Sequence, residues 1–121
     1  MKKLFIIGAG AFGREIHFWA KQHPDCGTVW ELDAFLEDNT EALREYGNFA
    51  PIQPLSGHRP DAESLYLNGI AQPKLKQAIL APLIAAGAEF LTFVHPSAKV
   101  GERVTLGRGA VLCPGAIVTV D

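Results

Sequence analysis

The final segment of the chain, residues 93–121, repeats with a period of six, and this period restricts the possible folds more than any other feature. Aliphatic residues occupy every sixth position: Val94, Val100, Leu106, Leu112 and Val118. A period of six places successive apolar residues on different faces of an α-helix, and a β-hairpin would alternate every two residues around a single turn. Short strands joined by tight turns fit the pattern, so this segment predicts a parallel β-helix built from hexapeptides.

Small residues complete the repeats. Small or branched apolar residues stand four positions after the first four aliphatic ones, at Ala98, Val104, Ala110 and Ala116. Turn positions are supplied by Gly101, Gly107, Gly109 and Gly115. Three hexapeptides make roughly one coil, so about one and a half coils are predicted, whereas a solenoid needs about three stacked repeats to be stable. We therefore expect that the chain is truncated or that it leans on another chain.

The composition excludes several classes of protein. The chain has 121 residues, is 48% hydrophobic and carries a net charge of −2, which argues against nucleic-acid and acidic-membrane partners. It has no apolar stretch long enough to span a membrane, and its N-terminal apolar run is too short for a signal peptide, so we expect a cytoplasmic protein. Cys26 and Cys113 are expected to be free thiols, and no cluster of residues suggests a metal.

A glycine-rich turn follows the first apolar run. Residues 3–7 predict a buried parallel strand, residues 14–23 show helical spacing, and Pro24 ends that helix. The sequence between strand and helix reads GxGxxG. In this setting glycines let the backbone approach a ligand, and the helix N-terminus presents N–H groups to phosphate. A tight turn that serves packing alone is the alternative. The predicted ligand-binding residues of this turn are Gly8, Gly10, Ala11, Phe12 and Gly13.

An acidic pair follows the second predicted strand, residues 28–36. Asp33 is twenty residues beyond Gly13, but the phase of the strand places Glu37 and Asp38 at its carboxyl end, where a Rossmann protein binds a ribose. A solvated turn explains the pair equally well.

The segment that follows carries no clear chemistry. Thr40 predicts the cap of a short helix over residues 41–46, and residues 48–63 predict a loop. His58 and Arg59 are expected to be solvated within this loop.

A third strand over residues 64–71 places Asn68 and Gly69 at its carboxyl end, beside the expected crevice. The next helix begins at Pro73 and carries Lys76 near its start, where the amine would meet phosphate.

The same helix contains Pro82, which predicts a kink or a restart. Its expected buried face is made by Leu75, Ile79 and Leu83. A fourth strand is predicted over residues 90–94.

Together these elements predict an α/β fold, with a small Rossmann-like parallel-sheet domain over residues 1–92 and the start of a β-helix over residues 93–121. The first part is short for a complete dinucleotide fold, so it favours a mononucleotide or sugar nucleotide over NAD.

Four stretches carry a resemblance to a known family. They are residues 35–39, residues 68–75, residues 93–98 and residues 111–116. In combination with the glycine turn they resemble the NeuD/PglD-like family of sugar O- and N-acyltransferases. The resemblance implies that the N-terminal domain holds a nucleotide-linked sugar, UDP-linked or related. It also implies that a left-handed β-helix trimerises and binds acetyl-CoA between coils, and that a histidine of a His–Asp pair in a later coil is the general base.

The family's functional residues match this chain only in part. The glycine turn matches, as do Glu37 and Asp38. Asn68-Gly69 stands where relatives often have a glycine followed by an acid or asparagine. Lys76 stands where many relatives have an arginine. No residue matches the catalytic pair, since His95 lies in a structural motif, and the acetyl-CoA groove needs later coils. His17 and His23 are expected to be solvated or half-buried, with no catalytic role.

Three functions follow. The first is the N-terminal part of an acetyl-CoA-dependent acetyltransferase that acetylates an amino or hydroxyl group of a nucleotide-linked sugar for surface glycan synthesis, inactive as this chain alone. The second is a Rossmann oxidoreductase using NAD(P). The third is a non-enzymatic assembly module that self-associates through the open end of its tail.

Overall fold

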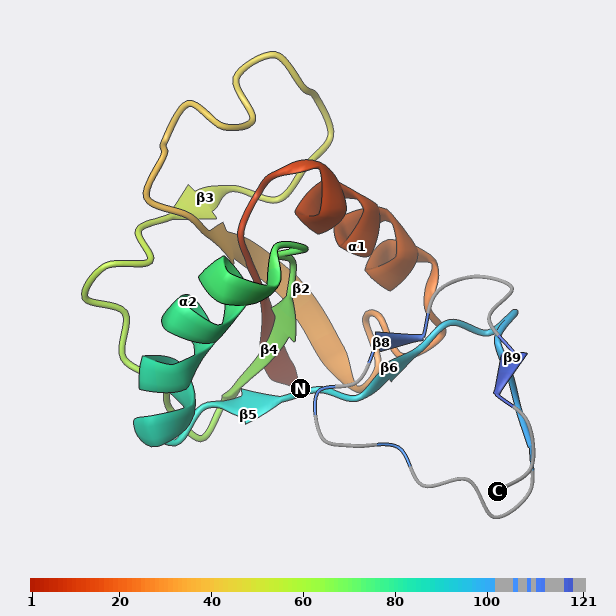
Figure 1. Ribbon diagram of the computed structural model, residues 1–121. Helices are drawn as coiled ribbons and strands as arrows, with labels where there is room; N and C mark the ends of the chain where they lie inside the picture. The colour runs from red at the N-terminus through yellow and green to blue at the C-terminus, as the bar shows by residue number, and fades with distance from the viewer. Residues whose placement is uncertain (102–105, 107–108, 110, 113–116, 119–121) are drawn as a thin grey trace.

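A five-stranded parallel sheet organises the first ninety residues of the computed structural model (Figure 1). The structure describes residues 1–101, 106, 109, 111–112 and 117–118. The strand order is β3-β2-β1-β4-β5, and every neighbouring pair is parallel. The strands are β1 (Lys2–Ile7), β2 (Trp30–Leu36), β3 (Ile52–Gln53), β4 (Ser64–Asn68) and β5 (Glu89–Phe90). This parallel α/β arrangement confirms the predicted fold class.

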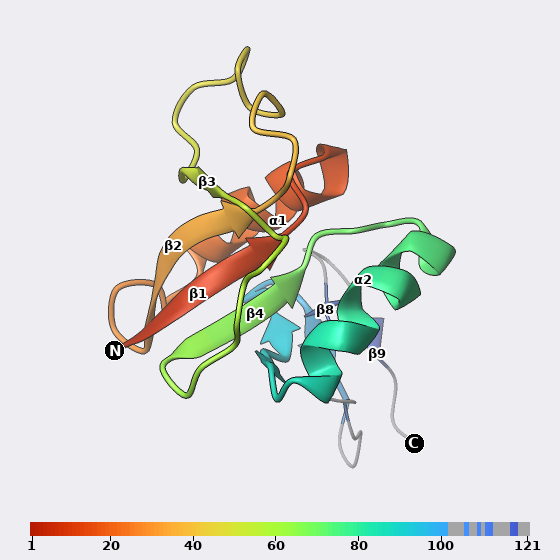
Figure 2. The same cartoon turned by 90° about the vertical axis from the view of Figure 1, so that its left-hand side faces the viewer.

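Two helices cover opposite faces of the sheet, as the two views show (Figures 1 and 2). Successive side chains of a strand point to opposite faces, so β1 contributes to two separate cores. Leu4 and Ile6 pack with α1 (Ala11–Gln22), whereas Phe5 and Ile7 pack with α2 (Pro73–Ala85). The two helices therefore frame the carboxyl end of β1 from either side.

Two helical predictions need correction. α1 begins at Ala11, three residues earlier than expected, so the end of the glycine motif forms its first turn. The short helix predicted over residues 41–46 is a series of turns, because the N–H groups of Ala42, Arg44 and Tyr46 donate to carbonyls three residues back rather than four. Thr40 does not cap it; Asn39 Oδ1 accepts a hydrogen bond from the Glu41 N–H at 3.1 Å instead.

The segment predicted as a plain loop, residues 48–63, contains the edge strand β3 and packs against the sheet. His58, expected in solvent, is half-buried, with Nε2 2.6 Å from the Tyr66 hydroxyl and its ring centroid 5.3 Å from that of Phe5. Arg59 is exposed, as predicted.

α2 runs without interruption through Pro82, so the predicted restart is wrong. Its buried residues are Leu80 and Leu83, whereas Leu75 is 47% exposed. The predicted apolar face was therefore misplaced at its N-terminal end.

The fourth predicted strand is divided. The Leu91 N–H donates to the Tyr66 carbonyl at 2.9 Å, after which the chain leaves the main sheet. Phe93 starts the next strand, β6 (Phe93–Val94), and its side chain is 1% exposed within the core that α1 covers.

The tail forms two small parallel pairs. β6 pairs with β8 (Val111–Leu112), and β7 (Lys99–Val100) pairs with β9 (Ile117–Val118). In both pairs the partner lies eighteen residues further along the chain, which is the offset that three hexapeptides per coil predict. The predicted parallel pairing at this offset is thus confirmed for these strands, whereas the β-helix itself stays a prediction. The predictions for Val104, Gly107, Ala110, Cys113, Gly115 and Ala116 lie outside the described residues.

Neither helix of the described chain has the length and apolar character that crossing a membrane requires. Cys26 is a half-buried free thiol.

Candidate functional site

Close packing explains three glycines around the turn after β1. Gly8 has a φ of +92°, in the region that favours glycine. A Cβ on Gly13 would lie 2.1 Å from the Gly8 carbonyl oxygen, and a Cβ on Gly69 would lie 2.8 Å from the Gly13 Cα. The turn, the start of α1 and the end of β4 therefore meet backbone to backbone.

Gly10 is different, because a Cβ added there would meet nothing within 4 Å. Gly10 is the exposed N-cap of α1, and no side chain caps the helix. The first N–H groups of a helix have no intrahelical acceptor and carry a positive partial charge. Packing does not require glycine at this position, and the backbone of Ala11 and Phe12 is open to an anionic ligand.

Glu37 lies directly beside the glycine turn. Its Oε1 accepts a hydrogen bond from the Ala9 N–H at 3.1 Å, and its Oε2 accepts one from the Asn39 N–H at 3.1 Å. The structure thus brings together two predicted parts of the site, the glycine turn and the acidic residue at the end of β2. Asp33, the alternative by spacing, lies within β2, at the residue where its pairing with β1 shifts register.

Asp38 points to a different partner. Its carboxylate accepts hydrogen bonds from the Ser56 hydroxyl at 2.6 Å and from the Ser56 N–H at 2.9 Å. These bonds hold the pKa of the exposed Asp38 carboxyl below its usual value. Asp38 therefore ties the end of β2 to the segment between β3 and β4.

Asn68 shapes the loop between β4 and α2. Its Nδ2 donates to the Ile70 carbonyl at 3.0 Å, and its Oδ1 accepts from the Ile70 N–H at 2.9 Å. Because both ends of the side-chain amide are used, Asn68 fixes the floor of the loop on which α2 begins.

A cavity of about 350 Å³ opens between the two helices and the tail. Its lining residues are Phe12, Asn68, Ile70, Ala71, Pro73, Lys76 and Val111. Three predicted residues, Phe12, Asn68 and Lys76, meet here, while Glu37 and Asp38 do not contribute to the lining. We call this cavity the crevice.

Sequence reasoning missed two residues near this site. Val111 of β8 lines the crevice, and its signal in the sequence is its position eighteen residues after Phe93. Arg14 follows the glycine motif directly; its Nη1 donates to the Ala9 carbonyl at 3.2 Å, and its guanidinium lies 4.3 Å from the Tyr46 ring centroid. Arg14 thus adds positive charge beside the glycine turn.

The histidines have structural partners. His17, expected to be solvated or half-buried, is only 2% exposed, and its Nε2 accepts a hydrogen bond from the Ala50 N–H at 3.0 Å. Burial, followed by the nearby Lys21 charge, lowers the pKa of His17 to about 4. His23 is half-buried, as predicted, and His95 Nδ1 accepts from the Ser97 N–H at 3.1 Å.

Within the described part of the chain, no three His, Cys, Asp or Glu side chains gather in a way that would hold a metal ion.

The chain is similar to a known acetyltransferase in sequence and to a solved structure in fold. No protein-family model matches the chain. GDP-perosamine N-acetyltransferase of Escherichia coli O157:H7 is 26% identical over 121 residues, and the match covers 96% of this chain and 53% of that protein. The acetyltransferase domain of PglB from Neisseria gonorrhoeae FA1090 superposes with a TM-score of 0.78 at 23% identity, covering 97% of this chain and 56% of that one.

The chain therefore spans about half the length of the relatives it matches. The structural likeness supports the α/β fold, and both similar proteins are named as acetyltransferases. With the motifs described above, these findings confirm that the chain resembles the NeuD/PglD-like sugar acetyltransferases.

Proposed function

We propose that this chain is the part of an acetyl-CoA-dependent acetyltransferase that holds a nucleotide-linked sugar, in an enzyme of surface glycan synthesis. The proposal depends on one observation above all. The open N-terminus of α1 stands beside a crevice whose far wall, Val111, belongs to the hexapeptide tail. A ligand held at the glycine turn would therefore extend toward the coil.

The diphosphate of the ligand would bind at the start of α1. The N–H groups of Ala11 and Phe12 and the helix dipole favour negative charge there. Lys76 lines the same crevice and is exposed, so its amine adds a positive charge on the α2 side.

Glu37 would hold the ribose. Its carboxylate offers roughly four acceptor sites, and two are used by the N–H groups of Ala9 and Asn39. The remaining two can accept the ribose hydroxyls, which places the nucleoside over β2 and the sugar over β4 and α2. The sugar then faces the coil, where acetyl transfer takes place in the proposed enzyme. Asp38 and Asn68 shape this site through the hydrogen bonds described above, and Gly69 shapes it through its close packing against Gly13.

The remaining parts of the reaction belong to the rest of the enzyme. Acetyl-CoA supplies the acetyl group, and no described residue is assigned to it. The proposed general base is a histidine of a later coil, so we expect these 121 residues alone to give no turnover. We further propose that residues 93–121 open a left-handed β-helix and that the complete protein is a homotrimer. The names of both relatives favour this function over an NAD(P)-dependent oxidoreductase.

A thermal-shift panel on this chain tests the proposal, with UDP-, GDP- and CMP-sugars, NAD and acetyl-CoA as ligands. A ligand at a hundred times its dissociation constant adds about 2.7 kcal/mol to the free energy of unfolding. We expect one sugar nucleotide to stabilise the chain, and NAD and acetyl-CoA to have no effect. Stabilisation by NAD alone would favour the oxidoreductase and overturn the proposal.

Gly10→Ala is the matched variant for this panel. Its Cβ meets nothing in the free protein, so the fold should remain intact, but the methyl group would stand in the path of a diphosphate. We expect the variant to unfold at nearly the wild-type temperature and to lose most of the ligand-induced shift. An unchanged shift would place the ligand elsewhere.

A further inference from the structure

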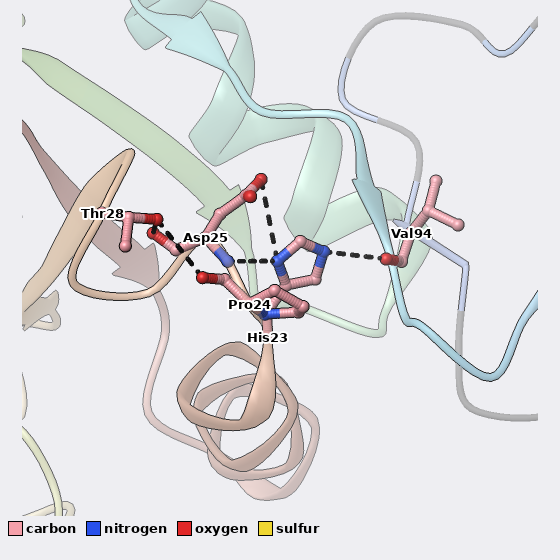
Figure 3. A network of polar contacts seen from close by, with 5 residues as sticks. All are labelled: His23, Pro24, Asp25, Thr28 and Val94. Atoms are coloured by element: carbon pink, nitrogen blue, oxygen red, sulfur yellow. Dashed lines mark hydrogen bonds and ion pairs between the residues drawn. The ribbon is translucent and has the colours of Figure 1, made fainter.

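A histidine joins the end of α1 to the tail (Figure 3). His23 follows α1 directly, and its Nε2 lies 3.1 Å from the carbonyl oxygen of Val94 in β6. Its Nδ1 accepts a hydrogen bond from the Asp25 N–H, also at 3.1 Å. Because Nδ1 is an acceptor, the proton of the neutral ring is on Nε2, and His23 donates it to Val94.

The ring is held in this orientation from several sides. Its centroid lies 5.1 Å from that of Phe93 and 6.0 Å from that of Trp30. The turn after the helix is closed by Thr28, whose hydroxyl is 3.3 Å from the carbonyl oxygens of Pro24 and Asp25 (Figure 3). The direction of the Nε2–H bond is therefore set by Trp30 and Asp25 as well as by Phe93 of the tail.

The His23–Val94 hydrogen bond, which we call the bridge, is connected to the crevice through β6 and β8. Phe93 and Val94 pair with Val111 and Leu112 of β8. Val111 lines the crevice and packs against the core that α1 covers. A fixed position of β6 thus fixes the wall that faces the start of α1.

We propose that His23 is a positioning residue for the sugar nucleotide, although it does not touch the ligand. α1 carries the glycine turn at one end and His23 at the other, so a single rigid helix sets the spacing between the diphosphate site and the wall formed by Val111. Loss of the His23–Val94 bond would widen or misalign the crevice and weaken binding. This inference rests on the proposed function.

Two substitutions distinguish the effect of the His23–Val94 bond from that of the local bond between His23 and the Asp25 N–H. In His23→Gln the side-chain amide nitrogen stands near the position of Nε2 and can still donate to the Val94 carbonyl. In His23→Asn the shorter side chain can still accept from the Asp25 N–H at the position of Nδ1, but does not reach Val94. Both remove the imidazole ring, so each is the control for the other.

The first measurement is hydrogen exchange of the free 121-residue variants, followed at residues 93–94 and 111–112. Because one net hydrogen bond is lost, we expect exchange in His23→Asn to be about threefold to tenfold faster than in His23→Gln. The second is calorimetric titration with the sugar nucleotide that stabilises the wild type, at a temperature where all variants are folded. Here we expect about a threefold to tenfold weaker affinity for His23→Asn, with His23→Gln close to the wild type.

Equal exchange in the two variants would show that the bridge does not hold the tail and would overturn the inference. Faster exchange with equal affinities would overturn the positioning role while leaving the proposed function intact. If the wild-type chain binds none of the sugar nucleotides, both proposals fall, and the exchange data then describe a purely structural bond.

Discussion

The two helices line the same crevice, but they are attached to the sheet in different ways. α1 buries Gly13, Ile16, His17 and Ala20, and its first turn touches the backbone of the neighbouring loops. α2 buries only Leu80 and Leu83. The α1 wall of the crevice is therefore fixed by backbone packing, whereas the α2 wall is attached by two buried side chains, the half-buried Ile79 and a short loop. The difference indicates that the α1 side of the crevice, where we propose that phosphate binds, is built more rigidly than the α2 side, which carries Lys76.

The largest loss of stability is expected from Gly13→Val, on the α1 side of the crevice. Its Cβ would lie 2.1 Å from the Gly8 carbonyl oxygen, and backbone cannot move aside cheaply. We expect a loss of unfolding free energy on the order of 4 kcal/mol, measured by urea denaturation. The neighbouring Gly10→Ala variant should lose less than about 0.5 kcal/mol. Equal losses in the two variants would contradict the packing argument.

Removal of a core side chain from α1 should be the next largest effect. Ile16 is 0% exposed, so Ile16→Ala leaves a cavity and should cost about 3 kcal/mol in the same assay. A cost below about 1 kcal/mol would mean that α1 is no better anchored than α2.

The buried His17 makes the attachment of α1 sensitive to pH. Its pKa is lowered from 6.5 to about 4, so the unfolded chain binds a proton at a pH where the folded chain does not. The contribution of neutral His17 to the free energy of unfolding is complete above pH 6.5, and about 3 kcal/mol of it is lost as the pH falls to 4.

His17→Gln is the control, since its amide oxygen can still accept from the Ala50 N–H but does not titrate. Urea midpoints measured between pH 7 and 4 should depend much less on pH in this variant. A smaller dependence of the same sign will remain, because burial also lowers the pKa of His58. A profile identical to that of the wild type would rule out His17 as the main source.

The smallest effect is expected on the outer face of α2. Leu75 is 47% exposed, so Leu75→Ser should change the free energy of unfolding by less than about 0.5 kcal/mol. A loss near that of Ile16→Ala would show that α2 is held as firmly as α1, and the contrast between the two walls would disappear.

The sequence patterns predicted correctly those elements whose structure depends on neighbouring residues. The buried run of β1, the glycine turn and α1 follow one another in the sequence, so their order and their meeting with Glu37 could be anticipated. The hexapeptide period likewise predicted parallel strands with an offset of eighteen residues.

The errors occurred where distant residues decide the outcome. Helical periodicity placed Leu75 inside because the pattern contains no information on where the sheet ends. The strand predicted over residues 90–94 divides because Phe93 is drawn into the core beneath α1. His17 is buried because Phe35 and Phe49, far along the chain, provide aromatic partners at 5.3 and 4.9 Å. Val111 was missed for the same reason, since it reaches the crevice only once the coil has closed.

The eighteen-residue offset of the tail has a consequence for how such a chain can change in length. A loop between ordinary strands can gain or lose residues one at a time, but Phe93 must meet Val111 and Lys99 must meet Ile117. An insertion that bulges out at a corner preserves both pairings, whereas an insertion of one whole coil places a new coil between the paired strands and keeps the register of the repeats. The length of this part of the molecule is therefore quantised, and insertions in its homologues should fall at the corners or come in units of one coil.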